Sequence, residues 1–214
     1  MNRRSIPFPA ILLVSLLTFP HDGTLMAQAP WERPKPPETK PISLDPKTTA
    51  LLVMDLSARC ENPKQICSRL FPAISDFVKG ARGAGVLVVY TVSLTAKGTL
   101  LGNVAAAFDR PPQEPLIHPD GYDKFMGGEL QGLLKAKGIK TVVVTGASSN
   151  TTVMYTGTTA ARSYQYEVVV PIDGTIANAE YEQEYTFHQL SVLPGDVSKL
   201  MRFTTLAGID FRKA

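Results

Sequence analysis

Three side chains in this 214-residue sequence could together do hydrolytic chemistry. Asp55 ends an apolar run, and a carboxylate there is either a base or orienter in a site or a cap for the following loop. Lys124 precedes a segment with helical spacing. It could belong to a site, or it could simply lie in solvent at the start of the helix. The hydroxyl of Thr152 lies where a helix begins, and most threonines at such places only cap the helix. These residues form a site only if the fold brings them together.

Residues 141–161 indicate a strand that turns directly into a helix. Residues 141–144 are four β-branched residues, typical of a strand buried on both faces, and Thr145 and Gly146 break the run. Ser148, Ser149 and Asn150 then supply N-cap chemistry for a helix from Thr151. The first N–H groups of such a helix point at the strand's carboxyl end, which makes an anion site. An ordinary βα turn without chemistry is the alternative.

The rest of the chain alternates between buried strands and helices. We expect further strands over residues 48–56, 86–92, 166–172 and 198–204, and helices over residues 70–83, 125–137 and 179–190. This order predicts an α/β domain with a parallel sheet and helices on both faces. Residues 93–122 hold Gly and Pro throughout, and a long irregular segment after a strand is usually functional.

The N-terminus has the pattern of a secretory signal peptide. Arg3 and Arg4 precede an apolar run over residues 11–17, and Ala27-Gln28-Ala29 forms a small-residue cleavage site. The run is too short for a membrane anchor, so we expect a signal over residues 1–29 and a periplasmic or secreted protein without a membrane segment after cleavage. A Pro-rich extended arm over residues 30–46 and one domain over residues 47–214 should follow.

The chain's two cysteines, Cys60 and Cys67, favour a disulfide. An even number of cysteines in an oxidising compartment is typical of a disulfide, and the alternative is a reactive thiolate in an electropositive setting. The formal charge of +3 is small and its basic residues are scattered, so nucleic-acid binding is not expected.

Four stretches in order resemble the isochorismatase-like cysteine hydrolase superfamily, over residues 48–211. They are ALLVMDLS, DKFMGGELQGLLKAKGIKTVVVTG, YTGTTAARSYQYEVVVPIDG and YEQEYTFHQL. The resemblance implies a three-layer α/β/α, Rossmann-type fold with a parallel sheet of about six strands. It also implies an Asp–Lys–Cys triad, in which Asp55 takes the Asp position. Either Lys124 or His118 supplies the positive charge, and Thr152 occupies the place of the Cys.

A threonine at that position changes the chemistry that the resemblance implies. A thiol is partly ionised near neutral pH, whereas an aliphatic alcohol needs a positioned base, which Asp55 could be while Lys124 or His118 balances the charge. Ser148 or Ser149 could also be recruited. The resemblance further implies a cis peptide at Ala147 and Ser148, and substrate contacts from a short segment of residues, namely Ala147, Ser148, Ser149, Asn150 and Thr151.

Two functions follow from the resemblance. The first is a periplasmic hydrolase of a small amide, ester or enol ether, with the oxyanion held by backbone N–H groups of residues 150–152. The second is an inactive family member that binds a small carbonyl compound or anion. The family's metal-dependent branch uses an Asp and two His, but residues 93–122 hold only His118, so neither zinc nor another cofactor is expected. We also expect a homo-oligomer, a dimer or tetramer, as in relatives.

Overall fold

The computed structural model describes residues 34–212. The expected signal peptide and residues 30–33 of the arm therefore lie outside the described part of the chain. The main sheet has the strand order β4-β3-β2-β5-β6-β8, with every pairing parallel, and a short strand β7 adds to the end of β5. The strands are, in chain order, β2 (Thr49–Met54), β3 (Leu87–Thr91), β4 (Leu116–Ile117), β5 (Thr141–Ala147), β6 (Glu167–Pro171), β7 (Thr175–Ile176) and β8 (Met201–Thr204). The prediction of a parallel sheet of about six strands is confirmed.

Two central strands, β2 and β5, form the middle of the sheet, and both consist mainly of apolar residues. Every residue of each is buried, and the register pairs Met54 with Gly146 at their carboxyl ends. Gly146 has φ +119°, and a Cβ built there would lie 2.0 Å from the Met54 carbonyl oxygen. Only glycine allows this approach, so Gly146 brings the ends of β2 and β5 together.

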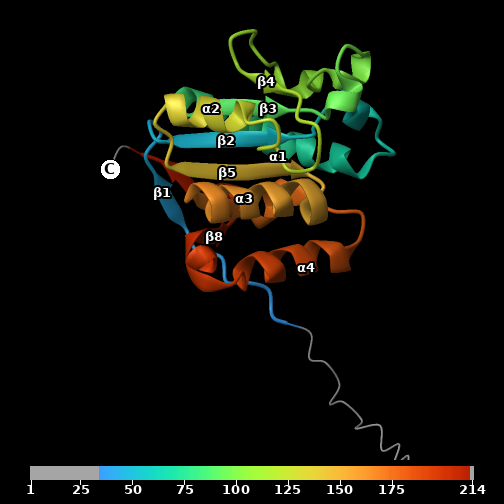
Figure 1. Ribbon diagram of the computed structural model, residues 1–214. Helices are drawn as coiled ribbons and strands as arrows, with labels where there is room; N and C mark the ends of the chain where they lie inside the picture. Colours follow the sequence, from blue (N-terminus) through green and yellow to red (C-terminus); the bar gives the residue numbers. More distant parts are fainter. Residues whose placement is uncertain (1–33, 213–214) are drawn as a thin grey trace, which may run out of the picture. The chain divides into compact units, whose positions relative to one another are not determined.

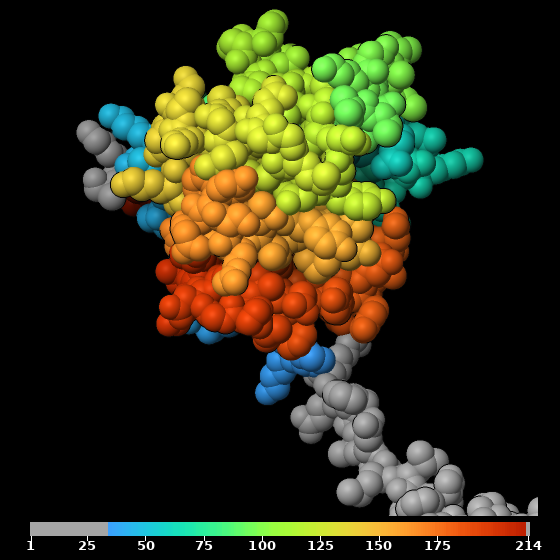
Figure 2. Space-filling model, viewed as in Figure 1, coloured from blue at the N-terminus to red at the C-terminus, as the bar shows by residue number. Residues whose placement is uncertain are grey.

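Helices cover both faces of this sheet, giving three layers (Figure 1). Side chains of α2 (Glu129–Ala136), α3 (Met154–Tyr164) and α4 (Glu180–Ser191) share one buried cluster, and α1 (Phe71–Ala84) packs in the cluster of the other face. Figure 2 shows α3 in orange between α2 in yellow and α4 in red. None of the helices in residues 34–212 is both long and apolar enough to cross a membrane.

Several element boundaries differ from the predictions. Thr145 and Gly146 do not break the strand after residue 144, because β5 continues through them to Ala147. The helix expected from residue 125 begins at Glu129, because Gly127 and Gly128 both adopt positive φ before it. The helix expected from Thr151 is preceded by a wide π-type turn over Ser149–Val153, so α3 begins at Met154. The last predicted strand begins at Met201, because the 3-10 turn Gly195–Leu200 takes up its first residues.

The end of the Pro-rich segment forms a strand that the sequence analysis did not predict. β1 (Ile42–Leu44) pairs in parallel with β9 (Ile209–Phe211) and makes a separate two-stranded sheet. The N–H of Lys40 donates to the Phe203 carbonyl at 3.0 Å, next to β8. This segment is therefore fixed to the domain rather than only extended over its surface.

The irregular segment after β3 is fastened to the domain by a half-buried arginine. The guanidinium of Arg82 in α1 donates to both carboxylate oxygens of Glu114, at 2.7 and 2.9 Å. It also donates to the Tyr90 hydroxyl at 2.8 Å and to the Phe108 carbonyl at 2.9 Å. Burial raises the pKa of the Tyr90 hydroxyl well above its usual range, with a further contribution from the Glu114 charge. The tyrosine therefore stays a neutral partner in this network.

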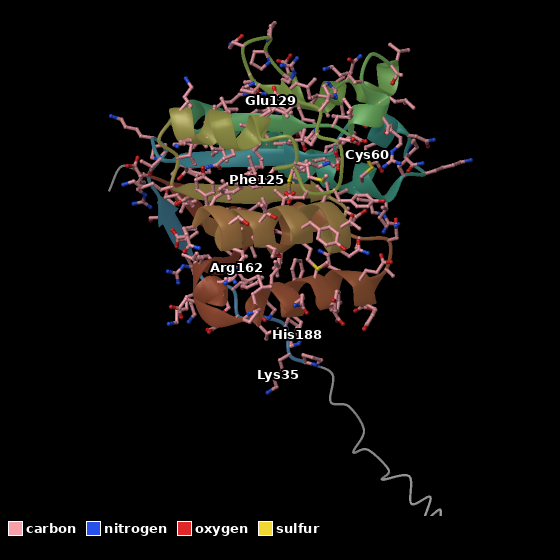
Figure 3. The ribbon with its side chains drawn as sticks, in the orientation of Figure 1. Lys35, Cys60, Phe125, Glu129, Arg162 and His188 are labelled. Atoms are coloured by element: carbon pink, nitrogen blue, oxygen red, sulfur yellow. A yellow bond between two sulfur atoms is a disulfide. The ribbon has the colours of Figure 1, made fainter. Side chains whose placement is uncertain are left out.

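The predicted disulfide between Cys60 and Cys67 is confirmed. It joins two adjacent 3-10 turns, Ala58–Glu61 and Ile66–Leu70, that connect β2 to α1. Both cysteines are buried, and Figure 3 labels Cys60 at the side of the sheet where β2 ends. The disulfide therefore fixes the loop that directly follows Asp55.

We expect loss of the disulfide to destabilise the fold. Closing so short a loop in the unfolded chain is worth roughly 2–3 kcal/mol, so the double variant Cys60→Ala/Cys67→Ala should lose about that much free energy of unfolding in urea titrations. Dithiothreitol should lower the stability of the wild type and leave the double variant unchanged. Equal stability of the wild type and the double variant would contradict the expectation.

Candidate functional site

Asp55, Lys124 and Thr152 meet at the carboxyl ends of β2 and β5. The Lys124 ammonium lies 2.7 Å from Asp55 Oδ2 and 3.0 Å from Oδ1. The Thr152 hydroxyl donates to Asp55 Oδ2 at 2.8 Å. One carboxylate thus accepts hydrogen bonds from an ammonium and from a hydroxyl, although the three residues are far apart in the sequence.

Asp55 is placed by the last turn of chain after β2. Its N–H donates to the Thr91 carbonyl at 2.8 Å, so it is still joined to β3. Its φ of +56° then turns the chain out of the sheet, a conformation that aspartate tolerates better than most residues. The side chain remains 20% exposed. The carboxylate therefore has one buried cation behind it and access to solvent.

Lys124 is held in place by the first half of α3. Its N–H donates to Thr156 Oγ1 at 3.0 Å, and the neighbouring Asp123 accepts the hydroxyl of Thr159 at 2.6 Å. The Lys124 side chain is 1% exposed, and its ammonium also donates to the Gly121 carbonyl at 3.3 Å. A buried ammonium requires a counter-charge, which Asp55 supplies.

Thr152 is presented by the turn between β5 and α3. The peptide bond between Ala147 and Ser148 is cis, as the resemblance implies. The turn then widens, and the Val153 N–H donates to the Ser148 carbonyl at 3.2 Å. Thr152 is 2% exposed, and its hydroxyl faces Asp55. The predicted hydroxyl at the start of a helix is therefore next to a carboxylate.

A cleft of about 550 Å³ opens over these groups. Of the predicted site residues, the cleft is lined by Asp55, Lys124, Ala147, Ser148, Thr151 and Thr152. It is therefore a recess of mixed polar and apolar lining at the sheet's carboxyl edge, the place where open parallel sheets bind ligands.

Three predicted residues lie elsewhere. His118 Nδ1 contacts the Val92 carbonyl at 3.1 Å, and the ring does not line the cleft, so Lys124 and not His118 contacts Asp55. The buried hydroxyl of Ser149 donates to Gln183 Oε1 at 2.6 Å and so fastens the turn to α4. Asn150 is also absent from the lining, since the wide turn over Ser149–Val153 leaves it outside the cleft before the chain returns to the cleft at Thr151.

The sequence analysis missed several residues of the cleft. The sequence indicated only that the irregular segment as a whole has a functional role, and did not indicate which of its residues would line the cleft. The lining residues from this segment are Ser93, Thr95, Ala96, Leu101, Asp120, Gly121 and Tyr122. Ser57 and Arg59 come from the disulfide-linked loop after β2. Because these two residues lie close to Asp55 in the sequence, they could have been predicted to line the cleft.

The described residues do not bring typical metal-ligand side chains together in one group. In residues 34–212 no group of three or more His, Cys, Asp or Glu side chains is arranged to hold a metal ion. The site is therefore described by its carboxylate, ammonium and hydroxyl groups.

Comparison with known proteins identifies the family. The model of the isochorismatase domain matches residues 49–200, so the chain belongs to the isochorismatase family. Asp55, Lys124 and Thr152 all fall within the matched part. No curated protein matches the sequence.

Solved structures share the fold at low sequence identity. An isochorismatase-like hydrolase from Alkaliphilus metalliredigens is 24% identical with a TM-score of 0.64, covering 75% of this chain and 95% of its own. N-carbamoylsarcosine amidase from Thermoplasma acidophilum is 19% identical with a TM-score of 0.62, covering 74% and 96%. The pyrazinamidase/nicotinamidase of Streptococcus mutans is 17% identical with a TM-score of 0.62, covering 72% and 99%. These likenesses confirm the fold.

We expect the two partners of the Asp55–Lys124 ion pair to differ in their effect on stability. Asp55→Asn leaves an ammonium that is 1% exposed without its counter-charge, which costs about 3–5 kcal/mol for a buried pair. Lys124→Met leaves a carboxylate that still reaches water and the Thr152 hydroxyl, so its cost should be smaller. Urea unfolding of both variants measures the difference.

The double variant Asp55→Asn/Lys124→Met serves as the control. It has no uncompensated charge, so it should be more stable than Asp55→Asn alone. Equal losses in the two single variants, without recovery in the double variant, would mean that the pair does not hold the site together.

Proposed function

We propose that this protein is a hydrolase of a small amide or ester, with Thr152 at the position of the family's cysteine and in the role of nucleophile. The single observation that supports this role is the 2.8 Å hydrogen bond from the Thr152 hydroxyl to Asp55. Two relatives of the same fold carry amidase names, N-carbamoylsarcosine amidase and pyrazinamidase/nicotinamidase, which favours an amide among the substrate classes.

The first step forms an ester with the enzyme. Thr152 Oγ1 attacks the carbonyl carbon of the substrate, and its proton passes to Asp55 Oδ2, the oxygen to which it is already hydrogen-bonded. The carbonyl oxygen becomes an oxyanion, held by backbone N–H groups at Thr151 and Thr152, the residues of this turn that line the cleft. The C–N or C–O bond then breaks, and Asp55 returns the proton to the leaving group.

The second step releases the acid. A water molecule attacks the acyl-threonine carbonyl and gives its proton to Asp55, and the Thr152 oxygen leaves and regains a proton. Lys124 keeps a positive charge against Asp55 throughout, so the carboxylate does not move between the two steps. Asp55 thus acts as base and acid in turn, and Lys124 orients it.

A second function, ligand binding without turnover, has one observation in its favour. Both cysteines of the chain form the disulfide, so the chain has no thiol that could attack a substrate. An alcohol is a weaker nucleophile than a thiolate near neutral pH. In this second function the same cleft holds a small carbonyl compound or anion.

Export and assembly are further parts of the proposal. The Cys60–Cys67 disulfide supports a periplasmic or secreted location, since disulfides persist in oxidising compartments. Assembly into a dimer or tetramer stays a prediction from the resemblance.

We expect variants of the triad to separate the two functions. Ammonia or alcohol release from a panel of small amides and esters should fall about 100-fold or more in Asp55→Asn and in Thr152→Ala, since each removes a group that takes part in the transition state. Thr152→Ser keeps the hydroxyl and should retain measurable activity. Full activity in Thr152→Ala would exclude threonine as the nucleophile, and ligand binding without turnover in the wild type would support the second function.

The variant Thr152→Cys tests the assembly of the site independently of the native substrate. Next to the Lys124 ammonium and at the start of a helix, a thiol should ionise readily and react with iodoacetamide. Lys124→Met in the same background should slow the alkylation, because it removes the nearby positive charge. An unreactive thiol at position 152 would contradict the proposed geometry.

A further inference from the structure

We propose that Arg59 binds a carboxylate of the substrate, so that the substrate is a small amide or ester that also carries a carboxylate group. This inference rests on the proposed function and names the substrate class of the same cleft.

Arg59 is an exposed residue at the lining of the cleft, and its side chain has no protein partner in the described part of the chain. Within residues 34–212 no hydrogen bond or ion pair involves its side chain, in contrast to Arg82 and Arg202, which each bind a glutamate. Arginine stays protonated at all ordinary pH values and offers donors that match both oxygens of a carboxylate. A cleft that presents such a group unpaired favours an anionic ligand.

The other positive charge of the cleft is already compensated. Lys124 lies against Asp55 and is 1% exposed, so it is not available to a substrate carboxylate. Asp120 also lines the cleft, on the segment before Lys124, and no ion pair joins it to Arg59. A carboxylate is therefore attracted to the Arg59 side and repelled by Asp120. These two charges would orient a substrate whose carbonyl lies at Thr152.

The backbone that carries Arg59 is held from several sides. The N–H of Ala58 donates to the Asn103 carbonyl at 2.9 Å, and that of Cys60 donates to Ser57 at 2.8 Å. The Glu61 carboxylate accepts the N–H of Ala106 at 2.7 Å, and Cys60 is linked to Cys67. Because this turn is fixed before a ligand arrives, less ordering cost opposes binding.

Binding of monoamides of dicarboxylic acids tests the inference. The probes are malonamate, succinamate and glutaramate, each beside its neutral diamide, titrated calorimetrically into the Thr152→Ala variant so that turnover does not interfere. At least one monoamide should bind, and its diamide should bind at least about 10-fold more weakly. Arg59→Gln should weaken the monoamide about 10- to 100-fold, the range for a charged hydrogen-bonded contact, and leave the diamide unchanged.

Two further variants carry different expectations. Arg69→Gln removes an exposed arginine of the neighbouring turn that does not line the cleft, and it should change neither ligand. Asp120→Asn removes the repelling charge and should tighten the monoamide.

The outcomes separate the inference from the proposed function. Binding that depends on Arg59 in a protein that hydrolyses none of the probes supports the inference and counts against the hydrolase. Hydrolysis by the wild type that is equal in Arg59→Gln supports the hydrolase and overturns the inference. Equal affinity for monoamide and diamide, or no monoamide binding at all, also overturns it.

Discussion

The structure of the site depends on one carboxylate that serves two donors. Asp55 neutralises the buried ammonium of Lys124 and accepts the hydroxyl of Thr152. An ammonium that is 1% exposed is costly without a counter-charge, so this ion pair couples the stability of the domain to the arrangement of the site. Here the ion pair holds the Asp55 carboxylate against the Thr152 hydroxyl in an open cleft.

The sheet and α3 bring these groups together. Gly146 allows the ends of β2 and β5 to approach closely, which places Asp55 beside the turn that carries Thr152. Thr156 and Thr159 of α3 bind the segment that contains Lys124. The helix that begins directly after the Thr152 turn therefore also positions the Lys124 ammonium. The disulfide fixes the loop after Asp55 and with it Arg59. Each part of the cleft is thus attached to a buried element.

Much of this arrangement could be predicted from the sequence. Continuous apolar runs predict buried parallel strands, and parallel strands end at one edge, which explains why Asp55 and Thr152 lie close together. The even number of cysteines, together with the oxidising compartment that the signal peptide indicates, predicted the disulfide. The choice between His118 and Lys124 could not be made, because it depends on how α3 holds the segment before α2. The wide turn before α3 and the β1–β9 pair depend on tertiary contacts, and an unpaired Arg59 is recognised only when its surroundings are known.

The central claim is that Thr152 attacks the substrate with Asp55 as its base. The most direct measurement is peptide mapping by mass spectrometry after acid quenching of the protein with an activated ester such as 4-nitrophenyl acetate. Its rapid leaving group should let the acyl-enzyme accumulate. The account predicts an acetyl group on Thr152 in the wild type and none at this position in Asp55→Asn. Release of nitrophenol at the same rate in both proteins, with no acetyl group on Thr152, would contradict it.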